Sequence, residues 1–286
     1  MTNNLTSLSY IKELSRKYGF KFDKKYGQNF IINPSVCPRI ADSAGIDENS
    51  GVIEIGTGIG VLTSQLAQRA KKVVALEIDT SLQPILAETL AGYDNVKVIY
   101  QDVLKTDIAR LIKQEFGDMP VSVRANLPYY ITSPIIMKLL EENLPIDNIT
   151  VMVQKEAAAR ICAAPGSREA GAISLAVQYY SRPKVCFNVS PGSFYPPPKV
   201  TSSVIRLDIK KEKEVRPASE KNMFRLIKAA FGQRRKTFVN SVSANLSLPK
   251  AQVESALSAI GQNPMVRPEK LTLKEFVALS DILLTD

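Results

Sequence analysis

Short apolar segments alternate with helical patterns through the middle of the chain, and this alternation constrains the fold more than any other feature. Strand-like runs are predicted at residues 51–55, 73–77, 96–100, 121–125 and 149–153. Helices are predicted between them, at 61–70, 82–90, in a segment that ends near 116, and at 135–140. Strands that alternate with helices at this spacing predict a mostly parallel sheet covered by helices on both faces. The expected fold class is therefore α/β.

The flanking segments complete the predicted organisation. Helices are expected at 6–18, from 34 to 41 and at 170–179, a basic and aromatic loop at 24–31, and further strands at 185–189 and 200–209. A charged run at 210–220, which contains Pro217, predicts a boundary. Apolar residues then recur at helical spacing in one stripe from Phe224 to Val242, and Thr272 and Glu275 form a capping box that opens a last helix. We therefore expect a domain over residues 1–210, with an N-terminal arm over 1–33, and a small all-helical domain over 211–286.

Composition excludes several kinds of chemistry. The chain of 286 residues has no histidine, which rules out Ser-His-Asp and Cys-His catalysis and histidine-ligated metals. Its three cysteines form no C-x-x-C pair, so no metal site and no disulfide framework are expected. There is no apolar run long enough for a membrane span and no signal-peptide pattern at the start, so a cytoplasmic location is expected. These features favour a reaction in which a cofactor performs the difficult step and the protein orients it.

Positive charge is concentrated in one segment. The net charge is +9, and residues 210–240 alone contain ten Lys or Arg and three Asp or Glu. A basic segment on a nearly neutral body predicts a polyanionic partner such as RNA. A solvated helix face has the same composition, so charge alone does not decide between them.

Glycines after the first predicted strand indicate a cofactor pocket. Gly56, Gly58 and Gly60 let the backbone approach a ligand closely. The nicotinamide pattern G-x-G-x-x-G fails because its last position falls on Val61, and no phosphate-loop G-K-[ST] is present. The G-x-G-x-G form is that of S-adenosylmethionine sites. Glu77 at the end of the second strand can accept from ribose hydroxyls, and Asp102 after the third can accept from an adenine amino group.

The tetrapeptide from Asn126 to Tyr129 follows the fourth predicted strand and suits methyl transfer to a nucleobase amine. The Asn126 side-chain oxygen and the Leu127 carbonyl can both accept hydrogen bonds from the N–H groups of the amine and so make it more nucleophilic. Pro128 biases Leu127 to an extended backbone, and Tyr129 offers a ring on which a base can stack. An ordinary turn after a strand would use the same residue types. The alignment of Gly56, Glu77, Asp102 and Asn126 at successive strand ends favours a site.

Several motifs together resemble the small-subunit ribosomal RNA adenine dimethyltransferases, the KsgA/RsmA family. The resemblance spans about residues 24–242 and rests on these segments: Tyr26-Gly27-Gln28-Asn29-Phe30, Glu54-Ile55-Gly56, Leu76-Glu77-Ile78-Asp79, Gln101-Asp102, Asn126-Leu127-Pro128-Tyr129, Gln154-Lys155-Glu156, Ser193-Phe194, Pro196-Pro197-Pro198-Lys199-Val200 and Phe231-Gly232-Gln233-Arg234-Arg235-Lys236-Thr237. The last motif, with Leu127 in the tetrapeptide, distinguishes it from relatives that methylate large-subunit RNA. The resemblance implies a Rossmann-like methyltransferase domain that uses S-adenosylmethionine.

The resemblance also implies residue roles and a function. The cofactor would be bound by six residues: Asn29, Ile31, Gly56, Glu77, Asp102 and Asn126. The catalytic set would be Asn126, Leu127, Pro128 and Tyr129, with Phe194 held by the following prolines so that a base is sandwiched between it and Tyr129. Ile31 and Thr57 stand where Leu and Pro are commoner in the family.

The implied reaction is the dimethylation of N6 on two adjacent adenines in a hairpin near the 3′ end of small-subunit rRNA, within an immature small subunit. Arg234, Arg235 and Lys236 would contact RNA phosphates, and a monomer is expected. Two alternatives remain: a non-catalytic RNA-binding assembly or transcription factor that kept the fold, and, less favoured because of Val61, a dehydrogenase.

Overall fold

The chain divides into two compact units. The computed structural model describes residues 4–20, 28–43, 45–233 and 235–284. One unit comprises residues 1–158 with 183–209, and the other comprises 159–182 with 210–286. The second unit therefore includes a segment, 159–182, that the sequence-based division assigned to the first domain.

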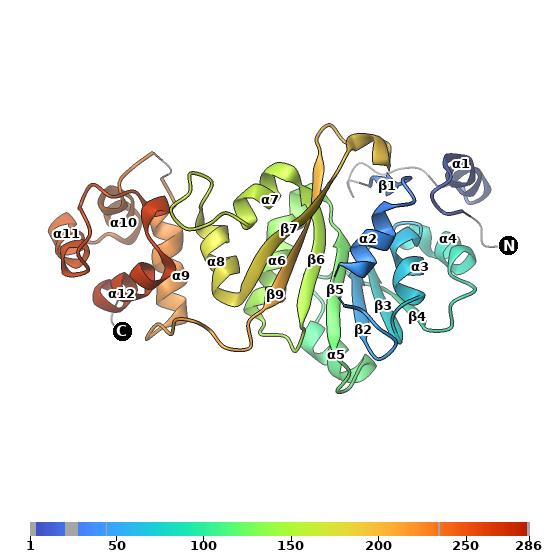
Figure 1. The fold of residues 1–286 in the computed structure, drawn as a ribbon, viewed down its shortest axis with the longest axis horizontal. Coiled ribbons are helices and arrows are strands. Elements are labelled where there is room, and N and C mark those ends of the chain that lie inside the picture. Colours follow the sequence, from blue (N-terminus) through green and yellow to red (C-terminus); the bar gives the residue numbers. More distant parts are fainter. Residues whose placement is uncertain (1–3, 21–27, 44, 234, 285–286) are drawn as a thin grey trace. The chain divides into compact units, whose positions relative to one another are not determined.

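A mixed sheet of seven strands forms the framework of the first unit (Figure 1). In spatial order its strands are β4 (Val96–Tyr100), β3 (Lys72–Glu77), β2 (Gly51–Ile55), β5 (Val121–Asn126), β6 (Asn148–Gln154), β9 (Ser202–Ile209) and β7 (Ser181–Val189). The first five run parallel, and β9 pairs antiparallel with β6. The order reverses direction between β2 and β5, which is the point where such sheets bind ligands.

Helices cover both faces of this sheet, with α2 and α3 on one face and α6 on the other (Figure 1). The helices of this part of the chain are α1 (Leu8–Lys17), α2 (Val36–Asp42), α3 (Val61–Ala67), α4 (Gln83–Thr89), α5 (Ile108–Glu115), α6 (Thr132–Glu141) and α7 (Lys155–Ile161). All five residues of β2 are buried, as expected for a central parallel strand covered on both sides. The predicted α/β class and its parallel strands are thereby confirmed.

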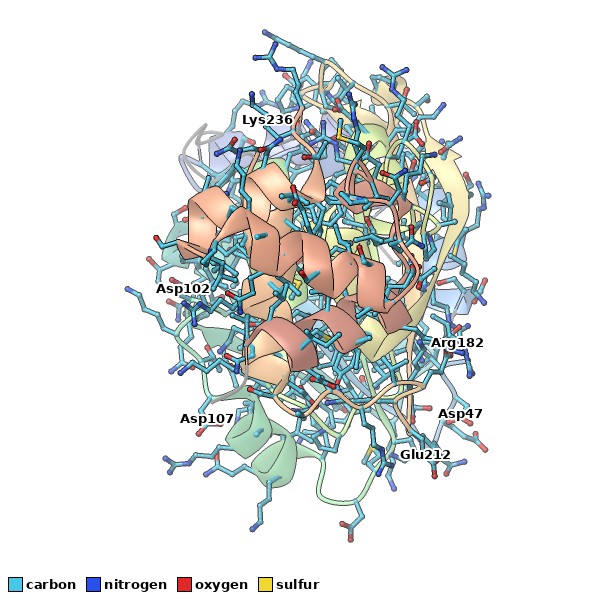
Figure 2. All side chains as sticks on the ribbon, turned by 90° about the vertical axis from the view of Figure 1, so that its left-hand side faces the viewer. Asp47, Asp102, Asp107, Arg182, Glu212 and Lys236 are labelled. Carbon is cyan, nitrogen blue, oxygen red and sulfur yellow. The ribbon has the colours of Figure 1, made fainter. Side chains whose placement is uncertain are left out.

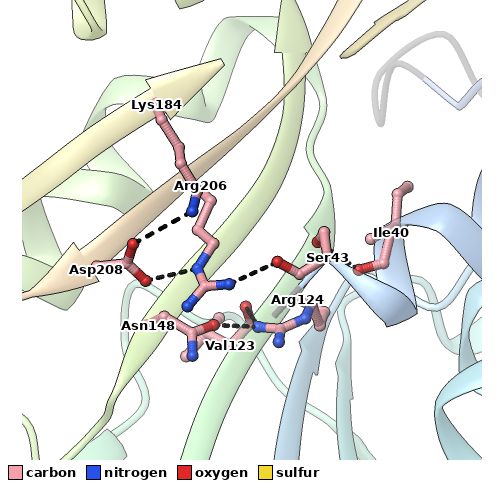
Figure 3. A network of polar contacts seen from close by, with 8 residues as sticks. All are labelled: Ile40, Ser43, Val123, Arg124, Asn148, Lys184, Arg206 and Asp208. Atoms are coloured by element: carbon pink, nitrogen blue, oxygen red, sulfur yellow. Dashed lines mark hydrogen bonds and ion pairs between the residues drawn. The ribbon is translucent and has the colours of Figure 1, made fainter. Parts of the chain in front are cut away.

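Two arginines, Arg124 and Arg206, make polar links across the sheet (Figure 3). Arg124 on β5 is fully buried, and its Nη1 donates to the Val123 carbonyl and to Asn148 on β6. Arg206 on β9 forms an ion pair with Asp208 and donates to the carbonyl of Ser43, the C-cap residue of α2. These contacts fasten α2 to the antiparallel side of the sheet. Burial lowers the pKa of Arg124 to about 9.

Two short strands, β1 (Phe30–Ile31) and β8 (Phe194–Tyr195), pair antiparallel and form a separate two-stranded sheet. Ile31 lies opposite Phe194, and the amides of Ile32 and Asn33 donate to the Ser193 carbonyl. The sequence predicted a loop for the first segment and a proline-stiffened segment for the second. The structure holds them instead by pairing with each other across more than 160 positions of the chain.

The second unit is helical. Its elements are α8 (Ala172–Tyr180), α9 (Glu220–Ala230), α10 (Phe238–Leu246), α11 (Lys250–Ala259) and α12 (Leu273–Leu283). Residues 159–182 are bonded to it at several points: the Gly166 amide donates to the Glu269 carbonyl, the Lys270 ammonium donates to the Gly166 carbonyl, and the Lys210 amide donates to the Tyr180 carbonyl. The predicted capping box of Thr272 and Glu275 is present at the start of α12.

The apolar stripe from Phe224 to Val242 belongs to two helices, α9 and α10, separated by residues 231–237. Thr237 starts α10 by accepting from the Asn240 amide, which is a standard N-cap arrangement. The basic motif therefore lies between helices and not on a helix face. None of the described helices has the length and apolarity that a membrane span needs.

Candidate active site

Four strands end at one edge of the sheet, and each supplies a predicted site residue there. Because the spatial order is β4-β3-β2-β5, Asp102, Glu77, Gly56 and Asn126 follow one another along this edge. They line a cavity of about 140 Å³. Ten predicted residues line it in total: Asn29, Ile31, Gly56, Glu77, Asp102, Asn126, Leu127, Pro128, Tyr129 and Phe194. Sequence positions from 29 to 194 thus meet at a single pocket within the first unit.

The glycine turn between β2 and α3 has a backbone that favours glycine. Gly56, Gly58 and Gly60 have φ of 78°, 54° and 89°, values that side-chain-bearing residues rarely adopt. A Cβ at Gly56 would lie 3.8 Å from the Asn126 carbonyl oxygen, an ordinary contact, so the positive φ rather than a lack of space favours glycine here. The turn therefore exposes backbone to the pocket at the sheet's point of reversal.

Glu77 holds this turn in place. Its Oε2 accepts from the Thr57 hydroxyl at 2.8 Å and from the Gly58 amide at 3.2 Å. Its Oε1 accepts from the amides of Ile78 and Asp79 at 2.8 and 2.9 Å. Both oxygens thus already have two donors each, so a ribose hydroxyl must replace one of them in order to bind this carboxylate.

Asp102 has a freer carboxylate. Its Oδ1 accepts from the Leu104 amide at 2.9 Å, which fixes the turn after β4. The other oxygen, Oδ2, is the atom that can accept from a ligand. Exposed Ile78 lines the same pocket next to Glu77. An apolar side chain beside a hydrogen-bond acceptor suits the face and the amino group of a purine.

The Asn126 side chain is oriented by the N-terminal arm. Its Nδ2 donates to the Asn29 carbonyl at 3.4 Å, so the amide is turned with its oxygen, Oδ1, as the remaining acceptor. The Pro128 carbonyl accepts from the Ile131 amide, whereas no described residue donates to the Leu127 carbonyl. The two acceptors predicted for the amine, Asn126 Oδ1 and the Leu127 carbonyl, therefore both remain available.

Tyr129 is held by a serine from β9. Its hydroxyl lies 2.8 Å from the Ser202 hydroxyl, and Ser202 itself is fully buried. The ring is partly exposed, and burial raises the pKa of its phenol, so it is neutral at ordinary pH. Tyr129 begins a short 3₁₀ helix, residues Tyr129–Ile131, that leads into α6. The ring therefore has a fixed position at the pocket wall.

Phe194 lines the pocket but is only 3% exposed. It is fixed by pairing of β8 with β1 and belongs to a core cluster with Phe30 and Ile31. Gln28 adds a further link, because its Nε2 donates to Asp79 at 2.6 Å. The arm, the segment after Glu77 and the aromatic segment at 194 thus support one another around the pocket.

The pocket lining also includes a buried carboxyl group, that of Glu54, two residues before Gly56. Glu54 lies on β2 and is fully buried. Burial raises its pKa to about 8, the nearby charge of Glu77 adds to this, and Thr63 opposes it. Glu54 is thus largely protonated near neutral pH.

The basic residues predicted to contact RNA belong to the second unit. Arg235 and Lys236 are exposed, and Figure 2 shows Lys236 at the surface. The third, Arg234, lies outside the described residues, as do Tyr26 and Gly27 of the arm motif.

Comparisons with known proteins now identify the family. Residues 19–283 match the family model described as ribosomal RNA adenine dimethylase. The chain belongs to the ribosomal RNA adenine dimethylase family. It is 50% identical to the ribosomal RNA small subunit methyltransferase A of Bacillus licheniformis, over 99% of this chain and 98% of that one. It is 49% identical to the protein of the same name from Lachnoclostridium phytofermentans, over 95% and 94% of the two chains.

Solved structures agree with this assignment to the dimethylase family. A dimethyladenosine transferase from Plasmodium falciparum superimposes with a TM-score of 0.70 at 26% identity, covering 87% of this chain and 95% of that one. The 23S rRNA methyltransferase ErmE has a TM-score of 0.66 at 26% identity, covering 89% and 99%. The predicted Rossmann-like methyltransferase fold and the predicted family are confirmed.

Sequence reasoning missed three residues at the dimethylase pocket. Ser202 is bonded to Tyr129, Ile78 lies beside Glu77, and Tyr130 is 64% exposed in the pocket lining. Ser202 lies two residues after the proline-rich motif that ends at Val200, and Ile78 lies within the motif from Leu76 to Asp79. The partner of the Ser202 hydroxyl becomes visible only when β9 returns beside β6.

Proposed function

We propose that the protein transfers methyl groups from S-adenosylmethionine to N6 of two adjacent adenines, in a hairpin near the 3′ end of small-subunit rRNA, and that it acts in small-subunit biogenesis. The observation that carries this proposal is the single pocket that unites ten residues of separate motifs in a member of the adenine dimethylase family. Its two unused acceptors beside a neutral tyrosine match the needs of an aromatic amine.

The residues of the sheet edge fit S-adenosylmethionine. Gly56 allows close backbone approach, Glu77 suits the ribose, and Asp102 with Ile78 suits the adenine. Asn29, Ile31 and Asn126 complete this side of the pocket. When bound, the cofactor would supply a methyl group on a sulfonium, whose neutral thioether is a good leaving group. The pocket contains no pattern for a pyrophosphate, in keeping with a cofactor that has none.

The acceptors of the tetrapeptide act on the amine of the target adenine. This amine is a poor nucleophile because its lone pair is delocalised into the ring. Asn126 Oδ1 and the Leu127 carbonyl accept hydrogen bonds from its two N–H groups and draw the nitrogen toward a tetrahedral shape. Tyr129 stacks on one face of the base and Phe194, which lines the same pocket, on the other, so that the base is sandwiched between the two rings. Positioning and polar preorganisation then provide the catalysis. No strong general base is needed, because the amine sheds its proton to water once the new bond to the methyl carbon has formed.

The second unit supplies phosphate contacts. Arg234, Arg235 and Lys236 bind the rRNA backbone, which accounts for the excess positive charge of residues 210–240. An immature small subunit is the proposed substrate. The monomeric state and the cytoplasmic location expected from the sequence stay predictions.

The decisive experiment uses Asn126→Ala. Single-turnover methyl transfer is measured on small subunits that lack the modification, with mono- and dimethyladenine resolved. We expect the rate to fall about 10²-fold or more at saturating cofactor, as with loss of one preorganised polar contact elsewhere. Unchanged activity would remove Asn126 from the reaction. A Phe194 variant with partial activity should accumulate monomethyladenine, because the monomethylated amine has only one N–H left to polarise.

A non-catalytic assembly factor is the alternative function. Wild-type protein that binds unmodified small subunits yet transfers no labelled methyl group would favour it. The two unused acceptors in the pocket argue against it, since a protein that only binds RNA has no need of them.

A further inference from the structure

Two consecutive tyrosines at the pocket differ sharply in their surroundings. Tyr129 is partly buried and bonded through its hydroxyl to Ser202. Tyr130 is 64% exposed, and no described residue makes a hydrogen bond to its hydroxyl. In a 3₁₀ helix successive side chains point about 120° apart, so the two rings face in different directions. One ring is thus part of the pocket wall, and the other lies at its mouth.

The exposure of Tyr130 is unusual within this pocket. Among the described residues only six large apolar side chains are exposed, and Ile78 and Tyr130 are the two that line the cavity. Ile78 lies beside Glu77, on the side suited to the cofactor. Tyr130 follows directly after the residues that receive the target base. An aromatic ring at the mouth of the pocket, directly after Tyr129, is next to the part of the RNA that adjoins the target base.

The neighbour of an extruded base is another nucleotide. When one base leaves its stack, the adjacent base loses a stacking partner, which is unfavourable. A neutral ring can replace that partner, because every base has a π-face. The phosphodiester link keeps the adjacent base close to the entrance of the pocket. The exposed ring of Tyr130 at the mouth of the pocket is placed so that the adjacent base can stack on it.

We propose that Tyr130 is the stacking platform for the nucleobase next to the target base. This inference rests on the proposed function, since it presumes that a base enters the pocket beside Tyr129. It assigns a second binding position for the RNA, at the mouth of the pocket, to a residue with no assigned role toward the reacting amine or the cofactor. Tyr130 thereby contributes to RNA affinity rather than to the chemical step.

The test measures equilibrium binding to unmodified small subunits and, in the same samples, single-turnover methyl transfer. Tyr130→Leu, which keeps apolar bulk but removes the π-face, should raise the dissociation constant about tenfold. Tyr130→Phe keeps the ring and should stay within about twofold of the wild type. The rate at saturating subunits and the dissociation constant for S-adenosylmethionine should not change in either variant.

A second set of subunits identifies the partner base. Replacement of the adenine next to the target by uracil weakens the available stacking surface. The penalty of Tyr130→Leu should then shrink to about threefold or less, because both changes remove the same contact. Equal penalties on both kinds of subunit, or wild-type affinity in Tyr130→Leu, would overturn the proposal. A rise in the cofactor dissociation constant would also overturn it and place the ring in the cofactor site. Loss of the proposed function would show separately, as wild-type protein that binds subunits and transfers no methyl group.

Discussion

At the scale of single residues, the hydrogen bonds of Glu77 set a condition on cofactor binding. Its carboxylate already accepts four hydrogen bonds, one of them from the Thr57 hydroxyl. The three other donors are backbone amides, which cannot leave without breaking the turn. The Thr57 hydroxyl can rotate away, so it is the donor that a ribose hydroxyl displaces. Thr57 also occupies a position where proline, with no such hydroxyl, is expected from the family resemblance.

Thr57→Val should therefore tighten S-adenosylmethionine binding. The change keeps the branched shape and removes the competing donor, so we expect the dissociation constant to fall about fivefold, or about 1 kcal/mol. Isothermal titration calorimetry measures it directly. Thr57→Ser retains a hydroxyl and serves as the control with near wild-type affinity. Weaker binding by the valine variant would mean that Thr57 orients Glu77 for the ribose instead of competing with it.

Two adjacent serines on β9 test how the position of Tyr129 affects catalysis. Ser202 is bonded to the Tyr129 hydroxyl, whereas Ser203 is bonded to Asn188 at 2.7 Å. Ser202→Ala should slow methyl transfer about three- to tenfold and raise the proportion of monomethyladenine, because the ring loses its anchor. Ser203→Ala is the matched control: both serines are buried, and it should leave the product ratio unchanged.

Tyr129→Phe completes this comparison. It removes the same hydrogen bond from the other side, so it should retain much of the activity and resemble Ser202→Ala in product ratio. The double variant should be no slower than the slower single one, since the two changes remove one shared contact. Independent, additive losses would show that Ser202 acts through something other than Tyr129.

At the scale of elements, the segment between α9 and α10 carries the proposed phosphate contacts. Replacement of Arg234, Arg235 and Lys236 by alanine should weaken binding to small-subunit rRNA and reduce the slope of log affinity against log salt by about two to three units. Cofactor affinity should stay the same. The control removes the same charge from exposed positions of the first unit, Lys71, Arg110 and Lys113. An unchanged salt slope in the first variant would make this segment a solvated surface only.

The elements also show what the sequence could reveal. The five parallel strands were predictable because each is a short segment rich in apolar residues that ends at a glycine or polar residue, as with Ile55 and Gly56 or Leu76 and Glu77. The cofactor side of the candidate site follows from those strand ends. The two-residue strands β1 and β8 have no periodicity of their own, and their pairing joins residues more than 160 positions apart. The break between α9 and α10 was missed because its flanking apolar residues keep helical spacing.

At the scale of the whole molecule, the ionisable groups contribute to stability in separate pH ranges. Hydrogen bonds from lysines lower the pKa of Glu115, and those from Lys17 and Tyr18 lower the pKa of Glu88. Carboxylates of this kind stabilise the fold above their unfolded pKa, and that stability is lost as the pH falls through their folded pKa. Their effect is therefore confined to acid. Arg124, with a pKa of about 9, stays charged in both states below that value and gives no slope there.

Glu54 affects the free energy of unfolding in the opposite direction from Glu88 and Glu115. Because the chain contains no histidine, few other side chains titrate in the same pH range. The folded pKa of Glu54 is about 8, whereas an unfolded glutamate titrates near 4.5. Between these values the unfolded state has lost its proton and the folded state keeps it, so the free energy of unfolding should fall as the pH rises, by roughly 3–5 kcal/mol in all.

Glu54→Gln cannot titrate and should make stability nearly independent of pH from about 5.5 to 8. Urea unfolding followed by circular dichroism at several pH values measures this, with exposed Glu48→Gln as the control that keeps the wild-type slope. A flat profile in the wild type would mean that Glu54 is ionised in the fold and has found a cationic partner.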